Sequence, residues 1–173
     1  MKALALSHPG EQIVVVSPKE NEATKWAEQH GLNVVIIPKQ ECYDEILLSA
    51  IKDVNIVCLA GYMYLLPENI VHEFRGKILN IHPSLLPKFG GKGMYGMNVH
   101  QAVYDAKEIE TGCTVHLVNE RYDDGDILIQ KSCTISPDDT PESIASKVLE
   151  LEHLAYPEAL TQQIYSLKQE FFT

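Results

Sequence analysis

The sequence lacks several features that would place a chain of 173 residues in a specialised class. Its four cysteines form no CxxC pair and no zinc-finger spacing, which argues against a disulfide framework and against a structural metal site. No apolar run is long enough to span a bilayer. The basic residues form no stripe and the formal net charge is −10, so neither nucleic acid nor an anionic membrane is an expected partner.

The chain also shows no signal-peptide pattern, internal repeat, low-complexity tract or linker. Residues 1–11 have too short an apolar core and no small-residue cleavage site. Three of the cysteines lie in apolar runs, and we expect buried thiols in a reducing compartment, which predicts a cytoplasmic location. The length suits one domain with a real core, so we predict a single domain over residues 1–173.

What the first half contains is an alternation of apolar strands and amphipathic helices. Near-continuous apolar strands alternating with helices predict an α/β fold with a mostly parallel open sheet and helices on both faces. Pro67 is expected at the first position of its helix. Near the start of the chain, the segment from Leu4 to Ser7 is compatible with a short strand. The expected strands are residues 12–16, 33–37, 54–60 and 78–82, and the expected helices are residues 21–30, 41–52 and 67–74.

The pattern changes after Pro87. Residues 89–97 hold four glycines without periodicity, which predicts a loop with unusual backbone angles or close backbone approach. Asn98 is a plausible cap for a helix over residues 98–107, and strands follow at 112–119 and 126–135. Thr140 and Pro141 start a helix to about residue 155, with a separate helical stretch after Pro157.

Polar side chains gather at the ends of these strands. Asn80 and His82 alternate onto the same face at the carboxyl end of their strand, where open α/β sheets place ligands. Asp123 opens an acidic turn, and a carboxylate reaching His82 would orient the imidazole and raise its pKa. An amide such as Asn80 can hold a developing oxyanion. Amide, imidazole and carboxylate together suit acyl transfer to an amine.

Each of these residues also has a purely structural interpretation. In that interpretation His82 is a satisfied histidine at a capped strand end, and His116 is a residue packed within its strand. Residues 123–126 then form a solvated turn. Metal binding by His82, His116 and Asp123 is a further alternative, but no HxH or HxxxH spacing supports it, so no metal is expected.

Three segments carry a resemblance to a known family: NIHPSLLP at residues 80–87, GCTVH at 112–116 and YDDGD at 122–126. They resemble the glycinamide ribonucleotide formyltransferases and, more broadly, the fold of formyltransferases that depend on 10-formyltetrahydrofolate. The resemblance runs from about residue 12 to 160. It implies transfer of a formyl group from 10-formyltetrahydrofolate to the amine of glycinamide ribonucleotide, in de novo purine biosynthesis.

The resemblance also implies roles for individual residues. Asn80 and His82 would stabilise the tetrahedral oxyanion, and Asp123 would hold the histidine and move protons off the amine through water. His116 would be a supporting residue, and Pro83 and Glu152 would contact the amine substrate. The residues implied in folate binding are Met63, Tyr64, Leu65, Leu66, Asn80, Asn119, Glu120, Arg121, Tyr122 and Asp123.

The sequence departs from the family at its start. Family members open with a strand, a glycine-rich phosphate loop and a helix, and only residues 1–11 stand in that place here. We therefore expect weaker ribonucleotide binding than in intact relatives, which calorimetric titration would measure. The alternatives are another amine such as an amino sugar nucleotide, a formyltetrahydrofolate deformylase, or a folate-binding homologue of low activity. A monomer and a homodimer are both compatible with the sequence.

Overall fold

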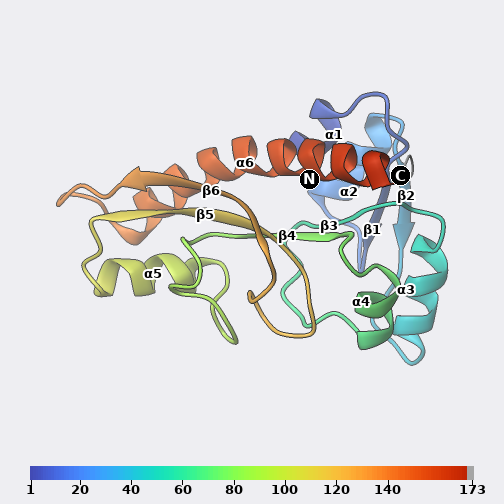
Figure 1. The fold of residues 1–173 in the computed structure, drawn as a ribbon, viewed down its shortest axis with the longest axis horizontal. Helices are drawn as coiled ribbons and strands as arrows, with labels where there is room; N and C mark the ends of the chain where they lie inside the picture. The colour runs from blue at the N-terminus through green and yellow to red at the C-terminus, as the bar shows by residue number, and fades with distance from the viewer. Residues whose placement is uncertain (171–173) are drawn as a thin grey trace. The chain divides into compact units, whose positions relative to one another are not determined.

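A computed structural model describes residues 1–170 of the chain, which divides into two compact units, Met1–Asn55 and Ile56–Thr173. Each unit is described by itself (Figure 1). The predicted single domain over residues 1–173 stays a prediction. No helix within residues 1–170 is both long and apolar enough to cross a membrane.

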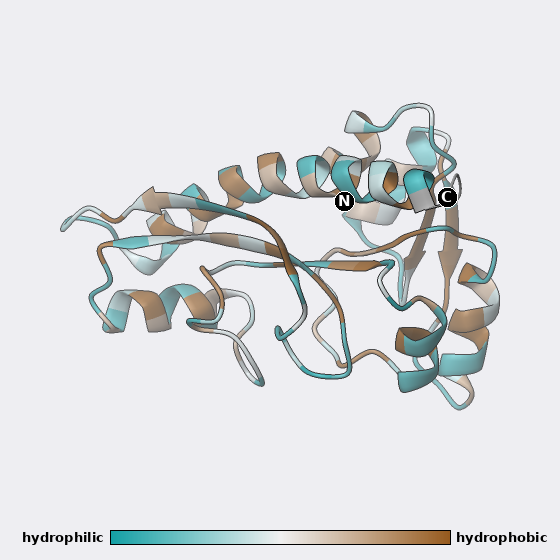
Figure 2. Ribbon diagram, in the orientation of Figure 1, coloured by the Kyte–Doolittle hydropathy of each residue, from teal (hydrophilic) through white to brown (hydrophobic). Residues whose placement is uncertain are grey.

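The first unit is a strand–helix–strand unit flanked by two further helices. Strands β1 (Val14–Ser17) and β2 (Asn33–Ile36) pair in parallel, and Figure 2 shows them as mainly hydrophobic. Helix α2 (Glu22–Gln29) connects them, and the Asn21 side chain caps it by accepting from two backbone amides. The helices α1 (Lys2–Ser7) and α3 (Tyr43–Ile51) complete the unit.

Two expectations for this unit are wrong. The segment from Leu4 to Ser7 belongs to helix α1, because its alanines and leucines are strong helix formers and Leu4 is buried. Cys42 is exposed, whereas a buried thiol was expected. It lies in the turn before α3 with a left-handed backbone (φ 63°), outside the apolar stripe of the helix.

The second unit contains a four-stranded sheet in the order β3-β4-β5-β6. The pair β3–β4 is parallel, as β1–β2 is, and the pairs β4–β5 and β5–β6 are antiparallel. Parallel strands with intervening helices confirm the predicted α/β class. The elements are β3 (Val57–Leu59), α4 (Glu68–Glu73), β4 (Ile78–His82), α5 (Met97–Asp105), β5 (Glu110–Leu117), β6 (Ile127–Thr134) and α6 (Pro141–Glu170).

Helix α6 provides much of the core of this unit. It runs beside β5 and β6 and also contacts α5 (Figure 1). Its fully buried residues recur at helical spacing and face the buried apolar residues of the sheet. Each such Ile or Val side chain contributes roughly 1.5–3 kcal/mol by leaving water. The buried residues are Ile144, Val148, Ala155 and Ala159 on the helix, and Ile78, Leu79 and Val115 on the strands.

Three predicted helix boundaries in this unit are wrong. Helix α6 continues through Pro157. The burial of Ala155, Tyr156 and Ala159 and the bonds from the Tyr156 hydroxyl to the carbonyls of Leu59 and Leu79 outweigh a proline cost of ~3 kcal/mol. Pro67 is the N-cap of α4, one position before the predicted place. Gly96 precedes α5 with a positive φ, and Asn98 lies inside the helix and donates to the Gly93 carbonyl.

The remaining cysteines fit the expectation of buried thiols better than Cys42 does. Cys113 is buried and Cys58 and Cys133 are half-buried, all with free thiols. Burial raises the pKa of Cys113 to about 12 and the pKa of Cys58 to about 11. Thiols with such pKa values are protonated at neutral pH and are poor nucleophiles.

Candidate active site

The candidate site is built on the adjacent ends of β4 and β5. In the antiparallel register Asn80 pairs with His116 and His82 pairs with Thr114. Because side chains alternate along a strand, these four side chains lie on one face of the sheet. His82 and His116 are 3% and 2% exposed, so both imidazoles are removed from bulk water.

The Asn80 amide is held by His116. Asn80 Nδ2 lies 3.2 Å from His116 Nε2, and His116 Nδ1 lies 2.8 Å from the Leu117 carbonyl. A carbonyl can only accept, so Nδ1 carries the hydrogen of the neutral ring and Nε2 accepts from Asn80. One of the two amide hydrogens of Asn80 then remains for another acceptor.

Asp123 lies between the two histidines. Its Oδ2 atom is 3.4 Å from His82 Nδ1, and its Oδ1 atom is 3.6 Å from His116 Nε2. The backbone amide of Gly91 donates to Oδ2 at 2.9 Å. His82 Nε2 donates to the Phe89 carbonyl at 2.8 Å. The structure therefore brings together the amide, the imidazole and the carboxylate singled out in the sequence, and their catalytic roles stay predictions.

Burial sets the charge of His82. It lowers the pKa of His82, and the nearby Asp123 carboxylate raises it by less, so the net shift is downward. The expectation that a carboxylate would raise this pKa is confirmed for the contribution of Asp123, but desolvation of the imidazolium outweighs that attraction, so the pKa as a whole is lowered. The neutral ring is favoured near pH 7.

Asp123 stays ionised in this environment. Burial alone raises the pKa of its carboxyl group, but the surrounding His116, Gly91 amide and His82 together outweigh burial, and the pKa is lowered. The site thus pairs a neutral imidazole with a carboxylate that can accept a proton.

The glycine-rich loop approaches the site closely at Gly90 and Gly91. A Cβ atom on Gly90 would lie 2.5 Å from Leu86 Cδ2 and 3.3 Å from Asp123 Cβ. Gly91 adopts φ 94° while it donates to Asp123. Both the unusual backbone angles and the close approach predicted for this loop are confirmed.

Gly125 makes a second close approach, immediately after the acidic turn. A Cβ atom there would lie 1.8 Å from the Leu117 carbonyl oxygen, so Gly125→Ala forces the backbone to shift. We expect the variant to lose ~1–3 kcal/mol of unfolding free energy. That corresponds to about 2–4 °C in Tm per kcal/mol for a chain of this size, measured by thermal denaturation.

Gly10→Ala is the matched control for this prediction. A Cβ atom on Gly10 would meet no heavy atom within 4 Å among the described residues, and we expect an unchanged Tm. Equal Tm values for both variants would contradict the close approach at Gly125.

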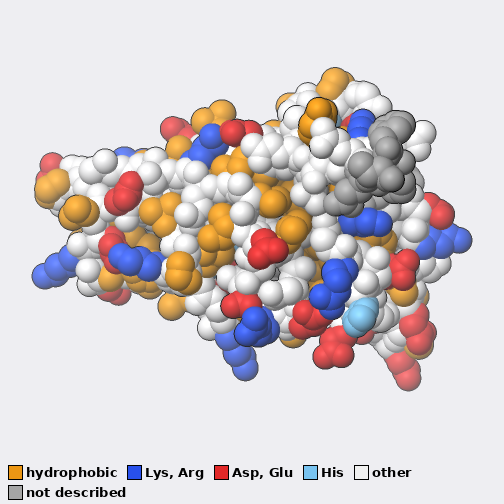
Figure 3. Space-filling view, viewed as in Figure 1, with side chains coloured by type: hydrophobic (Ala, Val, Ile, Leu, Met, Phe, Trp, Pro, Cys, Tyr) orange, Lys and Arg blue, Asp and Glu red, His pale blue; other side chains and the backbone are white. Residues whose placement is uncertain are grey.

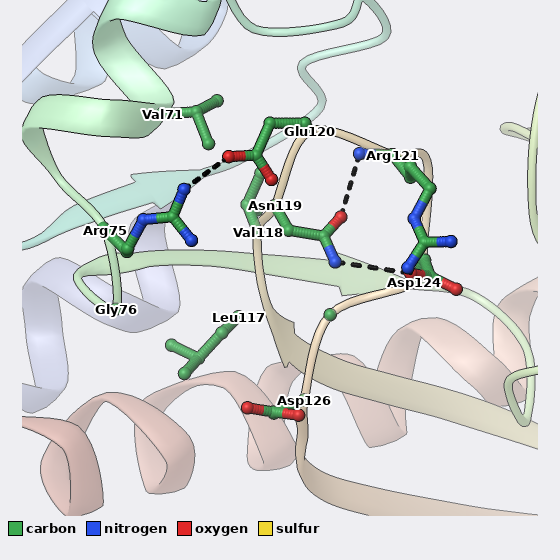
Figure 4. Close-up of a pocket in the computed structure, with 11 residues that line it drawn as sticks. Val71, Arg75, Gly76, Leu117, Val118, Asn119, Glu120, Arg121, Asp124 and Asp126 are labelled. Carbon is green, nitrogen blue, oxygen red and sulfur yellow. Dashed lines mark hydrogen bonds and ion pairs between the residues drawn. The ribbon is translucent and has the colours of Figure 1, made fainter.

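A hollow of ≈ 400 Å³ lies at the loop that follows β5, and its lining does not include Asn80, His82, His116 or Asp123 (Figure 4). Arg75 pairs with Glu120 at 2.6 Å, and Arg121 pairs with Asp124 at 2.5 Å. The Asn119 side chain accepts from the Arg121 amide and donates to Asp124, as the dashed lines in Figure 4 show. The lining residues are Val71, Arg75, Gly76, Leu117, Val118, Asn119, Glu120, Arg121, Asp124, Gly125 and Asp126.

The hollow includes only part of the set of residues that the sequence singled out for the folate. Asn119, Glu120 and Arg121 line it, whereas sequence reasoning missed Val71 and Arg75, which carry no motif. Of the other residues in that set, Met63, Tyr64, Leu65 and Tyr122 are exposed and Leu66 is buried, and their binding roles stay predictions.

The two residues expected to contact the amine also stay predictions. Pro83 is half-buried in the segment that follows β4. Burial raises the pKa of Glu152, and the charge of Glu152 contributes to the raised pKa of Cys113. Cys113 alternates onto the face of β5 opposite to Thr114 and His116.

No group of three or more His, Cys, Asp or Glu side chains within residues 1–170 is arranged to hold a metal ion. A metal-independent reaction remains an expectation.

Comparison with known proteins identifies a matching family and several similar proteins. The profile of the family described as "Formyl transferase" matches residues 5–160. The chain is 41% identical over 156 residues to a chloroplastic phosphoribosylglycinamide formyltransferase of Arabidopsis thaliana, and this match covers 86% of the chain but 53% of the plant protein. The chain therefore spans about half the length of that relative.

In two solved structures of similar proteins, the match to this chain covers a larger share of the other protein. A phosphoribosylglycinamide formyltransferase from Brucella melitensis is 36% identical, with a TM-score of 0.83 over 95% of this chain and 88% of that one. A second, from Anaplasma phagocytophilum, is 34% identical, with a TM-score of 0.83 over 92% of this chain and 78% of that one.

Proposed function

We propose that this chain, which belongs to the formyl transferase family, transfers the formyl group of 10-formyltetrahydrofolate to the amine of glycinamide ribonucleotide. The observation that carries the proposal is the placement of Asp123 between His82 and His116, with Asn80 bonded to the latter on the same face. The relatives are named as phosphoribosylglycinamide formyltransferases, which supports the choice of substrates.

The chemistry follows from these groups. The amine nitrogen forms a bond to the formyl carbon, and the carbonyl oxygen becomes an oxyanion. The remaining N–H of Asn80 can donate to the oxyanion, whereas the Nε2–H of His82 donates to the Phe89 carbonyl and would have to leave it to do the same. A preorganised donor favours the charge that develops in the transition state. The intermediate collapses by breaking the bond from the formyl carbon to N10 of the folate.

Proton movement completes the reaction. The attacking amine loses a proton while N10 gains one, so no net proton is released. Asp123 is ionised and can accept the proton through water, whereas His82 is neutral and oriented by Phe89. Protonated His82 would donate its Nδ1–H to Asp123 and so weaken that carboxylate as a base.

The hollow at the loop that follows β5 fits a pterin ring in size and lining. Small-molecule pockets span about 300–1,000 Å³, and this hollow of ≈ 400 Å³ combines the apolar Val71 and Leu117 with carboxylates and backbone groups. Residues 119–121, which the sequence singled out for the folate, line it, and Asp123 belongs to the same loop without lining the hollow. The folate supplies the activated formyl group, and Tyr64, Leu65 and Leu66 are predicted to contact it as well.

The decisive experiment is incubation of the protein with 10-formyltetrahydrofolate, with and without glycinamide ribonucleotide. Loss of the formyl group only in the presence of the amine supports the transferase. Loss without the amine would identify a deformylase, and no loss would indicate a folate-binding protein without turnover. An unchanged rate with a chelator present supports the expected independence from metals.

The distribution of charge bears on location and partners. Basic and acidic side chains are interspersed on the face shown in Figure 3, which agrees with small-molecule substrates and with no nucleic-acid or membrane partner. We propose a cytoplasmic location, although the Arabidopsis relative is named as chloroplastic. A monomer or a homodimer is expected.

A further inference from the structure

Gln130, on strand β6, reaches across the sheet toward the candidate site. The register pairs His82 with Thr114 and Thr114 with Gln130, so the three residues form a row across β4, β5 and β6. Gln130 is exposed, but its Nε2 atom donates to the Leu86 carbonyl and to Thr114 Oγ1, each at 2.9 Å. Its amide therefore bonds a loop and a buried hydroxyl rather than packing in the core.

The Thr114 hydroxyl, which accepts from Gln130, also bonds the segment that follows β4. It is fully buried, donates to the Ser84 carbonyl at 2.6 Å and accepts from the Leu86 amide at 3.0 Å. Ser84 Oγ in turn donates to the Lys88 carbonyl at 2.6 Å. The backbone at Ser84 and Leu86 is thus bonded to side chains of β5 and β6, and Ser84 in turn holds the Lys88 carbonyl.

Residues 84–91, which we call the strap, hold both catalytic candidates by backbone atoms. The Phe89 carbonyl accepts from His82 Nε2, and the Gly91 amide donates to Asp123 Oδ2. The Phe89 contact keeps the hydrogen of the neutral ring on Nε2 and turns the Nδ1 lone pair toward Asp123. A shift of the strap would therefore change the tautomer of His82 and the orientation of Asp123 together.

We propose that Gln130 is a positioning residue for the formyl transfer, because it fixes the strap that orients His82 and Asp123. The inference rests on the proposed function. Gln130 does not touch the reacting atoms, and it acts through Leu86 and Thr114.

Gln130→Glu tests the inference with little change in shape. The carboxylate has no N–H and would face the Leu86 carbonyl, so the strap loses its outer support. We expect kcat to fall roughly ten- to a hundredfold, since small misplacements of reacting groups cost rates of this order, while both KM values stay within about twofold. Gln162→Glu, the same change at an exposed position of α6, should leave kcat unchanged.

A second readout does not depend on turnover. In the wild-type protein the His82 Nε2 hydrogen should be protected and visible by NMR as a bonded N–H, and Gln130→Glu should shift or broaden that signal. Wild-type protein that transfers no formyl group would refute the proposed function, and an unshifted His82 signal in the variant would refute this inference separately. A folded Gln130→Glu protein with wild-type kcat would also overturn it.

Thr114 provides the test if Gln130→Glu does not fold. Thr114→Val keeps the shape but removes the hydroxyl that links Gln130 to the strap, so it should reproduce the loss of kcat and the change in the His82 signal. Thr114→Ser restores the hydroxyl and should rescue both. Equal kcat values for the Val and Ser variants would contradict the proposed linkage.

Discussion

Replacing Asn80 by alanine is expected to lower kcat for formyl transfer by about 10²–10³-fold, the usual cost of removing one oxyanion donor. Asn80 is bonded through one amide hydrogen to His116, which holds the other in place for the reaction. Because this interaction strengthens only as charge develops, the KM values should change much less than kcat. Steady-state kinetics with both substrates varied would measure the changes in kcat and in the two KM values separately.

Two further variants make the result specific. Asn80→Asp keeps the size of the side chain but removes both donors and adds a charge beside Asp123, so its kcat should be no higher than that of the alanine variant. Asn98→Ala removes an exposed amide that donates to the Gly93 carbonyl, and it should retain wild-type kcat. Near-full activity of Asn80→Ala would show that the oxyanion is held by other groups.

The arrangement of Asn80 and His82 could be predicted because it depends on local rules. The strand was predicted at residues 78–82 and is found as Ile78–His82, and alternation places both side chains on one face. Asp123 was singled out by its turn and by the resemblance to a family. Its contact with His82 is non-local, so alternation alone would not have located it.

The features that the sequence analysis missed or mispredicted depend on neighbours distant in the sequence. The net direction of the His82 pKa shift is set by burial of the ring, which local sequence does not reveal. The continuity of α6 through Pro157 depends on packing and on the Tyr156 hydroxyl, which bonds two strands. The contacts of Gln130 with Leu86 and Thr114 likewise join segments that no short motif connects.

Asp123→Asn should be the other severe substitution. The amide can still accept from the Gly91 N–H, but it carries no charge between His82 and His116 and cannot take a proton from the amine. In the serine-protease triad the same change costs ~10⁴ in kcat, and we expect a loss of about 10²–10⁴-fold here. Asp138→Asn, at an exposed position, is the control and should keep wild-type activity.

Asp123→Asn should also lower the pKa of His82. Burial lowers the pKa of His82 and Asp123 partly opposes it, so removing the carboxylate charge leaves burial less opposed and the pKa should fall further. An NMR titration of the His82 ring in wild type and Asp123→Asn would measure the shift. A rise in the pKa of His82, or no change, would mean that the carboxylate does not act on the imidazole, and Asp123 would then have to work on the substrate without the histidine.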